Sequence, residues 1–335
     1  MKLVSKGFLA LGLLFLFSAQ VRAENKIIKI DGSSTVYPIS EAIAEKFQES
    51  KKGEIKVTVG ISGTGGGFKR FCKGETDVQD ASRPVTKAEL EECKKNSIKF
   101  YELPIAYDAT VVAVSVKNKW LNEITVEELK KMWEPSAQGV IKKWNQINAK
   151  WPNEEFKIYG AGSDSGTFDY FTEAIVGKAK SSRGDYTASE DDNTLVKGIG
   201  GDKNALGYVP MSYYMENKKT LKALAIFGGP KAPIQAAVLP SKETVENNTY
   251  YPLSRPLFLY VNEASAKKTE VKEFVNYYLK NAANTVVEVK YISLPKVAYD
   301  MAEKHFLNGK LGTVFGSESH VGLKIEDLMK KEATF

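Results

Sequence analysis

The chain has 335 residues, of which 26% are charged and 43% are hydrophobic, and its formal net charge is +6 at pH 7. Its lysine pairs are scattered over polar stretches, so the charge does not predict a nucleic-acid-binding surface. A chain of this length exceeds the size at which one hydrophobic core usually stops growing, and two domains are expected.

The first 23 residues have the pattern of a secretory signal peptide. Lys2 and Lys6 precede an apolar run at 8–17, which is followed by the small-residue exit at 21–23. An apolar run this short does not span a bilayer as a helix. We therefore expect cleavage after Ala23 and an exported mature chain. No cysteine lies near that position to carry a lipid anchor.

The mature chain alternates short β-rich runs with helical patterns, which is typical of an α/β protein. Strands are predicted at 27–30, 55–61, 77–84, 109–116, 155–160, 206–210 and 257–261. Helices are predicted from about 36, and at 66–71, 86–95, 125–133, 168–175, 195–199, 266–281, 296–307 and 324–332. No flexible linker separates two halves, which favours two lobes that exchange strands.

Two of the predicted helices begin with a capping box, a Ser or Thr followed three residues later by Glu or Gln. Thr86 with Glu89 begins one, and Thr125 with Glu128 begins the other. The polar stretch at 178–192 has little periodicity. Its acidic pair Asp191 and Asp192 is interpreted as part of a solvated loop.

The chain has two cysteines, Cys72 and Cys93. Exported proteins meet oxidising conditions, so a disulfide between the two is predicted. The alternative is a pair of buried thiols, which the spacing does not exclude.

Three predicted strand-to-helix turns are built from Ser, Thr and Gly, at 32–36, 62–66 and 163–167. A helix N-terminus carries unpaired N–H groups and partial positive charge, and a nearby hydroxyl adds a further donor. Any one such turn is also an ordinary helix cap. Three of them at one edge of a sheet predict a site for a small oxyanion.

Enzyme motifs are absent from the sequence. The glycine-rich turn at 63–67 does not match a nucleotide P-loop, and neither a G-x-S-x-G elbow nor an H-E-x-x-H zinc motif occurs. The two histidines, His305 and His320, cannot build a His-rich metal site. We expect neither a catalytic residue nor a cofactor.

Five segments in order carry a resemblance to a known family: GSSTVYPI (32–39), SGTGGGFKRF (62–71), DASRP (80–84), SDSGTFDYF (163–171) and YPLSRPLFLYV (251–261). With the signal peptide, they resemble the periplasmic phosphate-binding protein of the ABC-type phosphate uptake system. The resemblance covers essentially the whole mature chain.

The resemblance implies the two-lobed α/β fold of class II periplasmic binding proteins, in which each lobe is a mixed sheet flanked by helices and the ligand lies in a cleft between the lobes. It divides the chain into a signal peptide at 1–23, lobe I at 24–108 plus 252–335, and lobe II at 109–251.

The implied function is periplasmic binding of inorganic phosphate by a monomer that delivers the ion to a membrane permease. The same resemblance implies no enzyme activity, no cofactor and no nucleic-acid partner. Two alternatives stay open: binding or sensing of another oxyanion or a phosphate ester, and a secreted phosphatase on the same scaffold.

Matching each motif to the family pattern gives ligand residues from all three turns, with an uncertainty of one residue in the first two. The neutral ones are Ser34, Thr35, Val36, Ser62, Thr64, Ser165, Gly166 and Thr167.

The charged ligand positions depart from the family pattern. The family has an aspartate where this chain has Arg83, and an arginine where this chain has Ala161. We therefore hypothesise that Arg83 supplies the guanidinium and that Asp164 or another nearby acid accepts a hydrogen bond from the P–OH group. The alternatives are an Arg83 that lies on the surface or pairs internally with an acid such as Asp80, and an Asp164 that only caps a helix.

Overall fold

The computed structural model describes residues 26–315 and residue 321. The predicted signal peptide, the helix predicted at 324–332 and His320 lie outside these residues. Within them, every helix is too short or too polar to cross a membrane.

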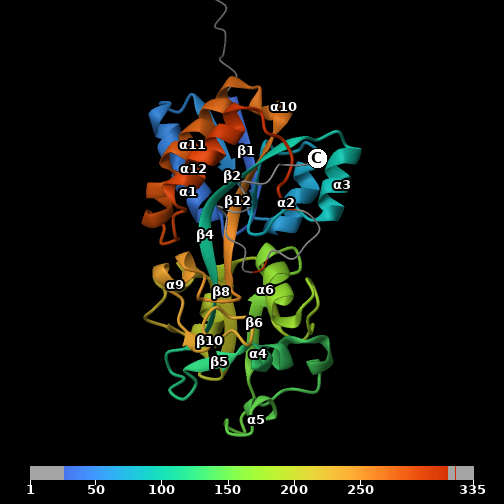
Figure 1. Cartoon of the computed structure of the whole chain (residues 1–335), viewed down its shortest axis with the longest axis vertical. Helices are drawn as coiled ribbons and strands as arrows, with labels where there is room; N and C mark the ends of the chain where they lie inside the picture. Colours follow the sequence, from blue (N-terminus) through green and yellow to red (C-terminus); the bar gives the residue numbers. More distant parts are fainter. Residues whose placement is uncertain (1–25, 316–320, 322–335) are drawn as a thin grey trace, which may run out of the picture.

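The described chain forms two lobes joined by two long strands (Figure 1). Lobe I contains β1 (Lys26–Gly32), α1 (Tyr37–Ser50), β2 (Ile55–Val59), α2 (Gly63–Phe71), β3 (Val78–Ala81), α3 (Lys87–Lys95), α10 (Glu263–Ala266), α11 (Thr269–Glu288) and α12 (Lys296–Leu307). Lobe II contains β5 (Glu123–Thr125), α4 (Val126–Trp133), the 3-10 helix η1 (Pro135–Ala137), α5 (Trp144–Ile147), β6 (Lys157–Ala161), α6 (Gly166–Val176), β7 (Thr187–Ser189), α7 (Asp192–Gly201), β8 (Ala205–Pro210), α8 (Met211–Glu216), β9 (Leu221–Ala223), β10 (Ala225–Phe227), β11 (Ala237–Val238) and α9 (Lys242–Glu246).

The long strand β4 (Phe100–Ser115) connects the lobes and belongs to both sheets. Its residues from Phe100 to Ala109 pair antiparallel with β12 (Ser254–Asn262), and those from Thr110 to Val114 pair with β8. The main sheet has the order β2-β1-β3-β12-β4-β8-β6-β7, with β9 beside β4, and a small sheet has the order β11-β10-β5. The lobe boundaries expected from the sequence fall inside β4 and directly before β12.

Parallel pairing brings the candidate turns to the junction between the lobes. In lobe I, β1 pairs parallel with both β2 and β3, so the chain leaves these strands at one common edge. In lobe II, β6 is parallel to its neighbours β7 and β8. The turn after β6 enters α6, which faces lobe I in Figure 1.

Most helix predictions are confirmed, and both capping boxes form, at Thr86 with Glu89 and at Thr125 with Glu128. α2 begins at Gly63, earlier than expected, because this glycine takes a left-handed φ of +73° that turns the chain into the helix.

The strand β4 also begins earlier than predicted, at Phe100 rather than Ala109. Two acids interrupt the apolar pattern in the part of β4 that pairs with β12, and each of them bonds to other side chains. Glu102 accepts hydrogen bonds from the Tyr260 and Thr313 hydroxyls, and Asp108 pairs with Arg255. Compensation by residues far along the chain therefore allows these acids to lie in a buried strand.

The predicted disulfide is confirmed. Cys72 follows the last turn of α2, Cys93 lies in α3, and the two sulfur atoms are bonded. Both residues are fully buried. This result removes the alternative of two free thiols.

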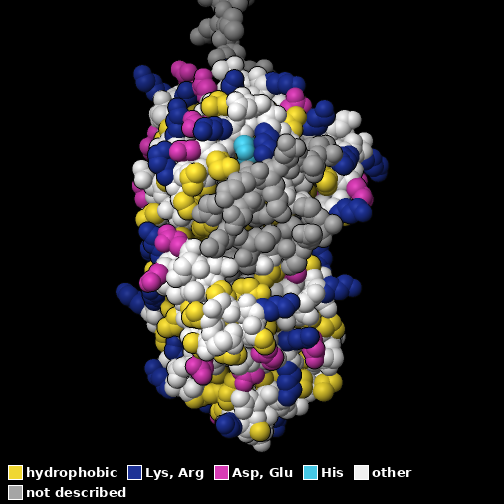
Figure 2. Space-filling model, in the orientation of Figure 1, with side chains coloured by type: hydrophobic (Ala, Val, Ile, Leu, Met, Phe, Trp, Pro, Cys, Tyr) yellow, Lys and Arg dark blue, Asp and Glu magenta, His cyan; other side chains and the backbone are white. Residues whose placement is uncertain are grey.

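Charged side chains of both signs are interspersed over both lobes on the face shown in Figure 2. Other charged side chains are instead buried. These include the side chains of Arg83, Asp108, Asp192 and Arg255.

A buried acid of lobe I predicts a pH-dependent stability. Asp80 is fully buried, and its Oδ1 accepts a 2.9 Å hydrogen bond from the Ser40 hydroxyl, whereas Oδ2 has no partner in the described chain. Burial, with a smaller contribution from the charge of Asp31, raises its pKa from 3.8 to about 8. Between these values the folded chain holds a proton that the unfolded chain has released, so this residue's contribution to stability falls as pH rises.

Asp80→Asn removes this pH-dependent loss of stability. Its effect on the free energy of unfolding, relative to the unmodified chain, is therefore expected to be more favourable at pH 8 than at pH 5 by about 1 kcal/mol or more. Urea unfolding at the two pH values measures the difference. An unchanged pH dependence would show that Asp80 is ionised in the folded chain.

Candidate functional site

The first predicted turn lies buried at the start of α1. Ser34, Thr35 and Val36 are each at most 5% exposed. Val36 occupies the N-cap position, so no side chain caps the first turn of this helix. The positive end of the α1 dipole is therefore not neutralised by a capping side chain.

The second turn divides its predicted residues between two environments. Thr64 is fully buried, its Oγ1 lies 3.2 Å from Ser82 Oγ, and it accepts a 3.1 Å hydrogen bond from the Ser82 N–H. Ser62 instead donates to Asp31 Oδ2 at 2.9 Å. Thr64 therefore faces the other lobe together with Ser82, and Ser62 is engaged inside lobe I.

The third turn begins α6 in lobe II. Ser165 is the N-cap, and its hydroxyl accepts a 3.1 Å hydrogen bond from the Thr167 N–H. Gly166 lies directly against lobe I, since a Cβ built on it would lie 2.5 Å from Thr64 Oγ1 and 2.6 Å from Ser82 Oγ. Only glycine allows this approach of the two lobes.

Gly166→Ala is therefore expected to prevent full closure of the lobes and to weaken ligand binding by at least ~10-fold, because the added methyl group cannot fit against Thr64 and Ser82. The thermal unfolding midpoint should change little, since alanine is a better helix former than glycine. Gly201→Ala is a matched control, because nothing lies within 4 Å of the position of its Cβ. Calorimetric titration compares the variants, and equal affinities would contradict the steric argument.

Threonines from the two lobes meet at a buried arginine. Thr35 Oγ1 and Thr167 Oγ1 are 3.1 Å apart. Arg255 Nη2 donates to Thr167 Oγ1 at 2.9 Å and to Thr35 Oγ1 at 3.3 Å. The structure thus brings together two predicted residues that are 132 positions apart in the sequence.

Arg255 is also half of a buried ion pair. Its Nη2 and Nε lie 2.8 and 3.1 Å from Asp108 Oδ2, and the two side chains are 1% and 0% exposed. Burial raises the pKa of Asp108, and the guanidinium beside it acts in the opposite direction. Arg255 Nη1 is buried with no hydrogen-bond partner in the described part of the chain. The arginine therefore has donor capacity left for a ligand.

A second buried acid lies beside this pair. Asp192, the first residue of α7, is 3% exposed, and no described residue bonds its Oδ2. Burial raises its pKa to about 7, and the nearby Ser34 hydroxyl and Arg255 lower it. The interpretation of this residue as part of a solvated loop was wrong: Asp191 is exposed, and Asp192 points inward because α7 begins here.

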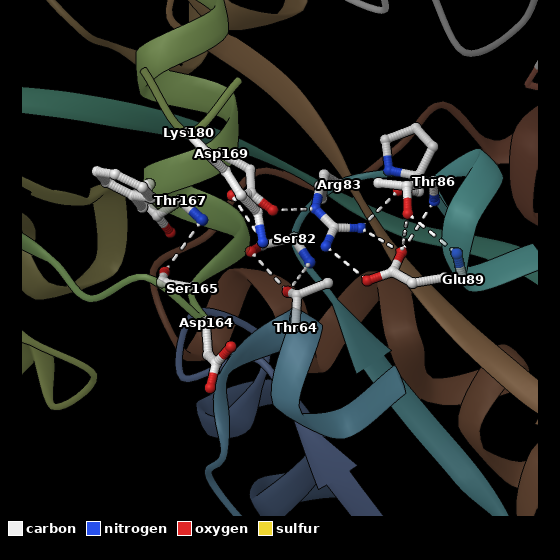
Figure 3. A network of polar contacts seen from close by, with 12 residues as sticks. Thr64, Ser82, Arg83, Thr86, Glu89, Asp164, Ser165, Thr167, Asp169 and Lys180 are labelled. Carbon is white, nitrogen blue, oxygen red and sulfur yellow. Dashed lines mark hydrogen bonds and ion pairs between the residues drawn. The ribbon is translucent and has the colours of Figure 1, made fainter. Parts of the chain in front are cut away.

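The guanidinium of Arg83 is occupied by protein groups. Its Nη1 and Nη2 bond to Glu89 at 2.8 and 2.7 Å, and its Nε bonds to Asp169 Oδ2 at 2.7 Å (Figure 3). A contact between Arg83 and a ligand stays a prediction. The geometry resembles the alternative of internal pairing, with Glu89 and Asp169 in place of Asp80.

Asp164 faces away from the Arg83 network in Figure 3. Its carboxylate is 2.8 Å from Lys69 Nζ and 43% exposed, whereas its backbone carbonyl accepts a 2.8 Å hydrogen bond from the Gly65 N–H. Its role as a ligand acid stays a prediction without geometric support.

Sequence reasoning missed Arg255, Asp108 and Asp192. A signal existed for the first two, because a charged residue inside an apolar run such as LSRPLFLYV or IAYDATVVAV is seldom buried without a partner. Asp192 gave no such signal, since it lies in a polar stretch. In residues 26–315, no group of three or more His, Cys, Asp and Glu side chains could hold a metal ion.

Comparison with known proteins agrees with the architecture. A family model described as a PBP superfamily domain matches residues 18–282. The chain is 48% identical to a protein named SphX from Synechocystis over 335 residues, 99% of this chain and 98% of that protein. It is 34% identical to the phosphate-binding protein PstS of Staphylococcus saprophyticus over 295 residues, 87% of this chain and 86% of that one.

A crystal structure of a possible phosphate binding protein from Planctomyces limnophilus is 45% identical to this chain. The match covers 85% of this chain and 98% of that one, with a TM-score of 0.64. The chain therefore belongs to the PBP superfamily, in the family that contains the phosphate-binding proteins named PstS.

Proposed function

We propose that this chain binds inorganic phosphate at the junction between its lobes and delivers it to the membrane permease of an ABC transporter. The family and the printed names of its relatives support the ligand. The observation that carries the proposal is the Nη1 of Arg255, a buried positive donor beside hydroxyls from both lobes that has no hydrogen-bond partner among the described residues.

The donors at this junction suit a small tetrahedral anion. Thr35, Thr64 and Ser82 offer hydroxyls from lobe I, and Thr167 offers one from lobe II. Thr35, Thr64 and Thr167 lie within two residues of the starts of α1, α2 and α6, and helix N-termini favour anions. Asp108 fixes the guanidinium of Arg255, so the arginine does not need to reorganise when the ligand enters.

In this proposal Asp192 takes the role that the sequence suggested for Asp164. Phosphate near neutral pH carries a proton on at least one oxygen, and an ionised Asp192 Oδ2 accepts a hydrogen bond from that P–OH group. Sulfate has no such proton and would place its charge against a buried acid. A site that leaves a buried polar group unpaired rejects the wrong ligand strongly.

The remaining expectations from the sequence complete the proposal. Residues 24–108 and 252–335 form lobe I, and residues 109–251 form lobe II. The exported chain acts in the periplasm as a monomer without catalysis. Phosphate shifts the population toward the closed form, because only that form offers the donors of both lobes at once.

Isothermal titration calorimetry on residues 24–335 with phosphate, arsenate and sulfate tests the function. We expect phosphate to bind tightly and sulfate at least ~100-fold more weakly. Failure to bind phosphate would overturn the proposal. Turnover of p-nitrophenyl phosphate by the same preparation would contradict the absence of catalysis.

A further inference from the structure

Arg83 connects the lobes through an ion pair with Asp169. This pair is separate from the contacts of Arg255 with Asp108, Thr35 and Thr167. Arg83 belongs to the loop after β3 in lobe I, and Asp169 belongs to α6 in lobe II. Their side chains are 7% and 4% exposed, and Arg83 Nε lies 2.7 Å from Asp169 Oδ2. Figure 3 shows this contact beside Thr64 and Ser82.

Lobe I alone fixes the other side of the guanidinium. Glu89 bonds both Nη atoms of Arg83, and its Oε2 also accepts hydrogen bonds from the N–H and hydroxyl of Thr86 at 2.9 Å each. These residues stand on one loop and the start of α3, so their geometry does not depend on lobe II. The Nε–H is left directed toward Asp169.

Asp169 has few other partners in lobe II. Lys180 Nζ lies 3.9 Å from its Oδ1, too far for a hydrogen bond, and the Lys180 side chain is 55% exposed. Separation of the lobes would leave Asp169 with this solvated lysine and with water. Most of the pairing energy of Asp169 is therefore available only when the lobes meet.

We propose that Arg83 and Asp169 form a closure latch: a positioning pair that stabilises the closed arrangement of the lobes without touching the ligand. The apparent affinity of a binding protein falls with the fraction of molecules in the competent form, so the latch sets the ligand concentration at which the chain closes. It acts on the lobes themselves, and its effect exists without any ligand.

The latch accounts for Arg83 better than a ligand clamp does. A bidentate clamp on a phosphate would require two neighbouring N–H groups, but Glu89 holds both Nη atoms at 2.7–2.8 Å and Asp169 holds Nε at 2.7 Å. In that alternative, loss of Asp169 would free the arginine for the ligand. For a latch, loss of Asp169 weakens binding.

Distance measurement between the lobes tests the latch. The only two cysteines form the disulfide, so spin labels can be placed uniquely at Glu91→Cys in lobe I and Lys178→Cys in lobe II, both exposed positions. Asp169→Asn is expected to shift the open-to-closed ratio toward open about tenfold without phosphate. The dissociation constant for phosphate should rise by the same factor.

Lys69→Ala is the matched control. It removes the exposed interlobe pair with Asp164, and pairs of this kind contribute little, so both readouts should change less than about twofold. Arg83→Lys, which cannot bond Glu89 and Asp169 together, is expected to act like Asp169→Asn and guards against misfolding of that variant. Unchanged distances between the spin labels in both Asp169→Asn and Arg83→Lys would overturn the proposal. Weaker phosphate binding by Arg83→Lys with unchanged distances would also overturn it. The distances without ligand report on the latch even if the proposed phosphate function fails.

Discussion

Replacement of Arg255 by glutamine is expected to weaken phosphate binding roughly 30- to several-thousandfold, since truncating one partner of a buried charge pair costs about 2–5 kcal/mol. The change removes the donor proposed to bind the ligand and the bonds to Thr35 and Thr167. It also leaves the acids Asp108 and Asp192 facing an incoming anion without a compensating charge. Isothermal titration measures the loss.

Two controls separate binding from folding. Arg255→Gln combined with Asp108→Asn removes both buried charges, and it should recover stability without recovering phosphate affinity. Arg183→Gln breaks an arginine–aspartate contact in lobe II, away from the junction, in which the Arg183 side chain is 3% exposed and that of Asp185 is 35% exposed. It should lower the melting temperature and leave the affinity of the folded protein unchanged. An Arg255→Gln variant that binds within about threefold of the unmodified chain would remove this residue from the site.

Asp192→Asn is expected to change the selectivity of the site. In the proposed site the carboxylate accepts a hydrogen bond from P–OH, whereas an asparagine presents an amide N–H₂ that can donate to the fully ionised oxygens of sulfate. The preference for phosphate over sulfate should fall by at least ~100-fold, with sulfate binding becoming measurable. Parallel titrations with both anions give the ratio.

Asp191→Asn provides the matched control for this change. Asp191 is the exposed neighbour that caps α7 through a 2.9 Å hydrogen bond from the Asn193 N–H, and asparagine caps a helix equally well. Its selectivity should match the unmodified chain. Retained rejection of sulfate by Asp192→Asn would assign the discrimination to another group.

The neutral part of the site could be predicted from the sequence because its chemistry is local. A strand, a Ser-Thr-Gly turn and a helix follow each other within a few residues, and each turn can be recognised without knowing its neighbours. The three turns are recognised this way, the family pattern then names Thr35, Thr64 and Thr167 within them, and the structure places all three threonines at the junction. The hydroxyl of Ser62 is instead donated to Asp31, a residue of β1, and its role as a ligand residue stays a prediction.

The charged part of the site could not be predicted because it depends on pairing across the fold. Arg255 and Asp108 are 147 residues apart, and strand pairing between β12 and β4 places them opposite each other. Arg83 became the candidate because it stands where the family pattern has an aspartate. Its true neighbour Glu89 was already visible as the acid of a capping box, but a capping acid can also bond a guanidinium, as it does here.

The position of β12 between β3 and β4 also determines the order in which the molecule can be assembled. All strands of lobe II have been synthesised by residue 238. In lobe I, β3 and β4 are joined only through β12, so its sheet is incomplete until residues 254–262 have been synthesised. We therefore expect lobe II to fold before lobe I. The sheet of lobe I is completed only when β12 inserts between β3 and β4. The first hundred residues of the chain would thereby stay free of a finished core until most of its length has been made.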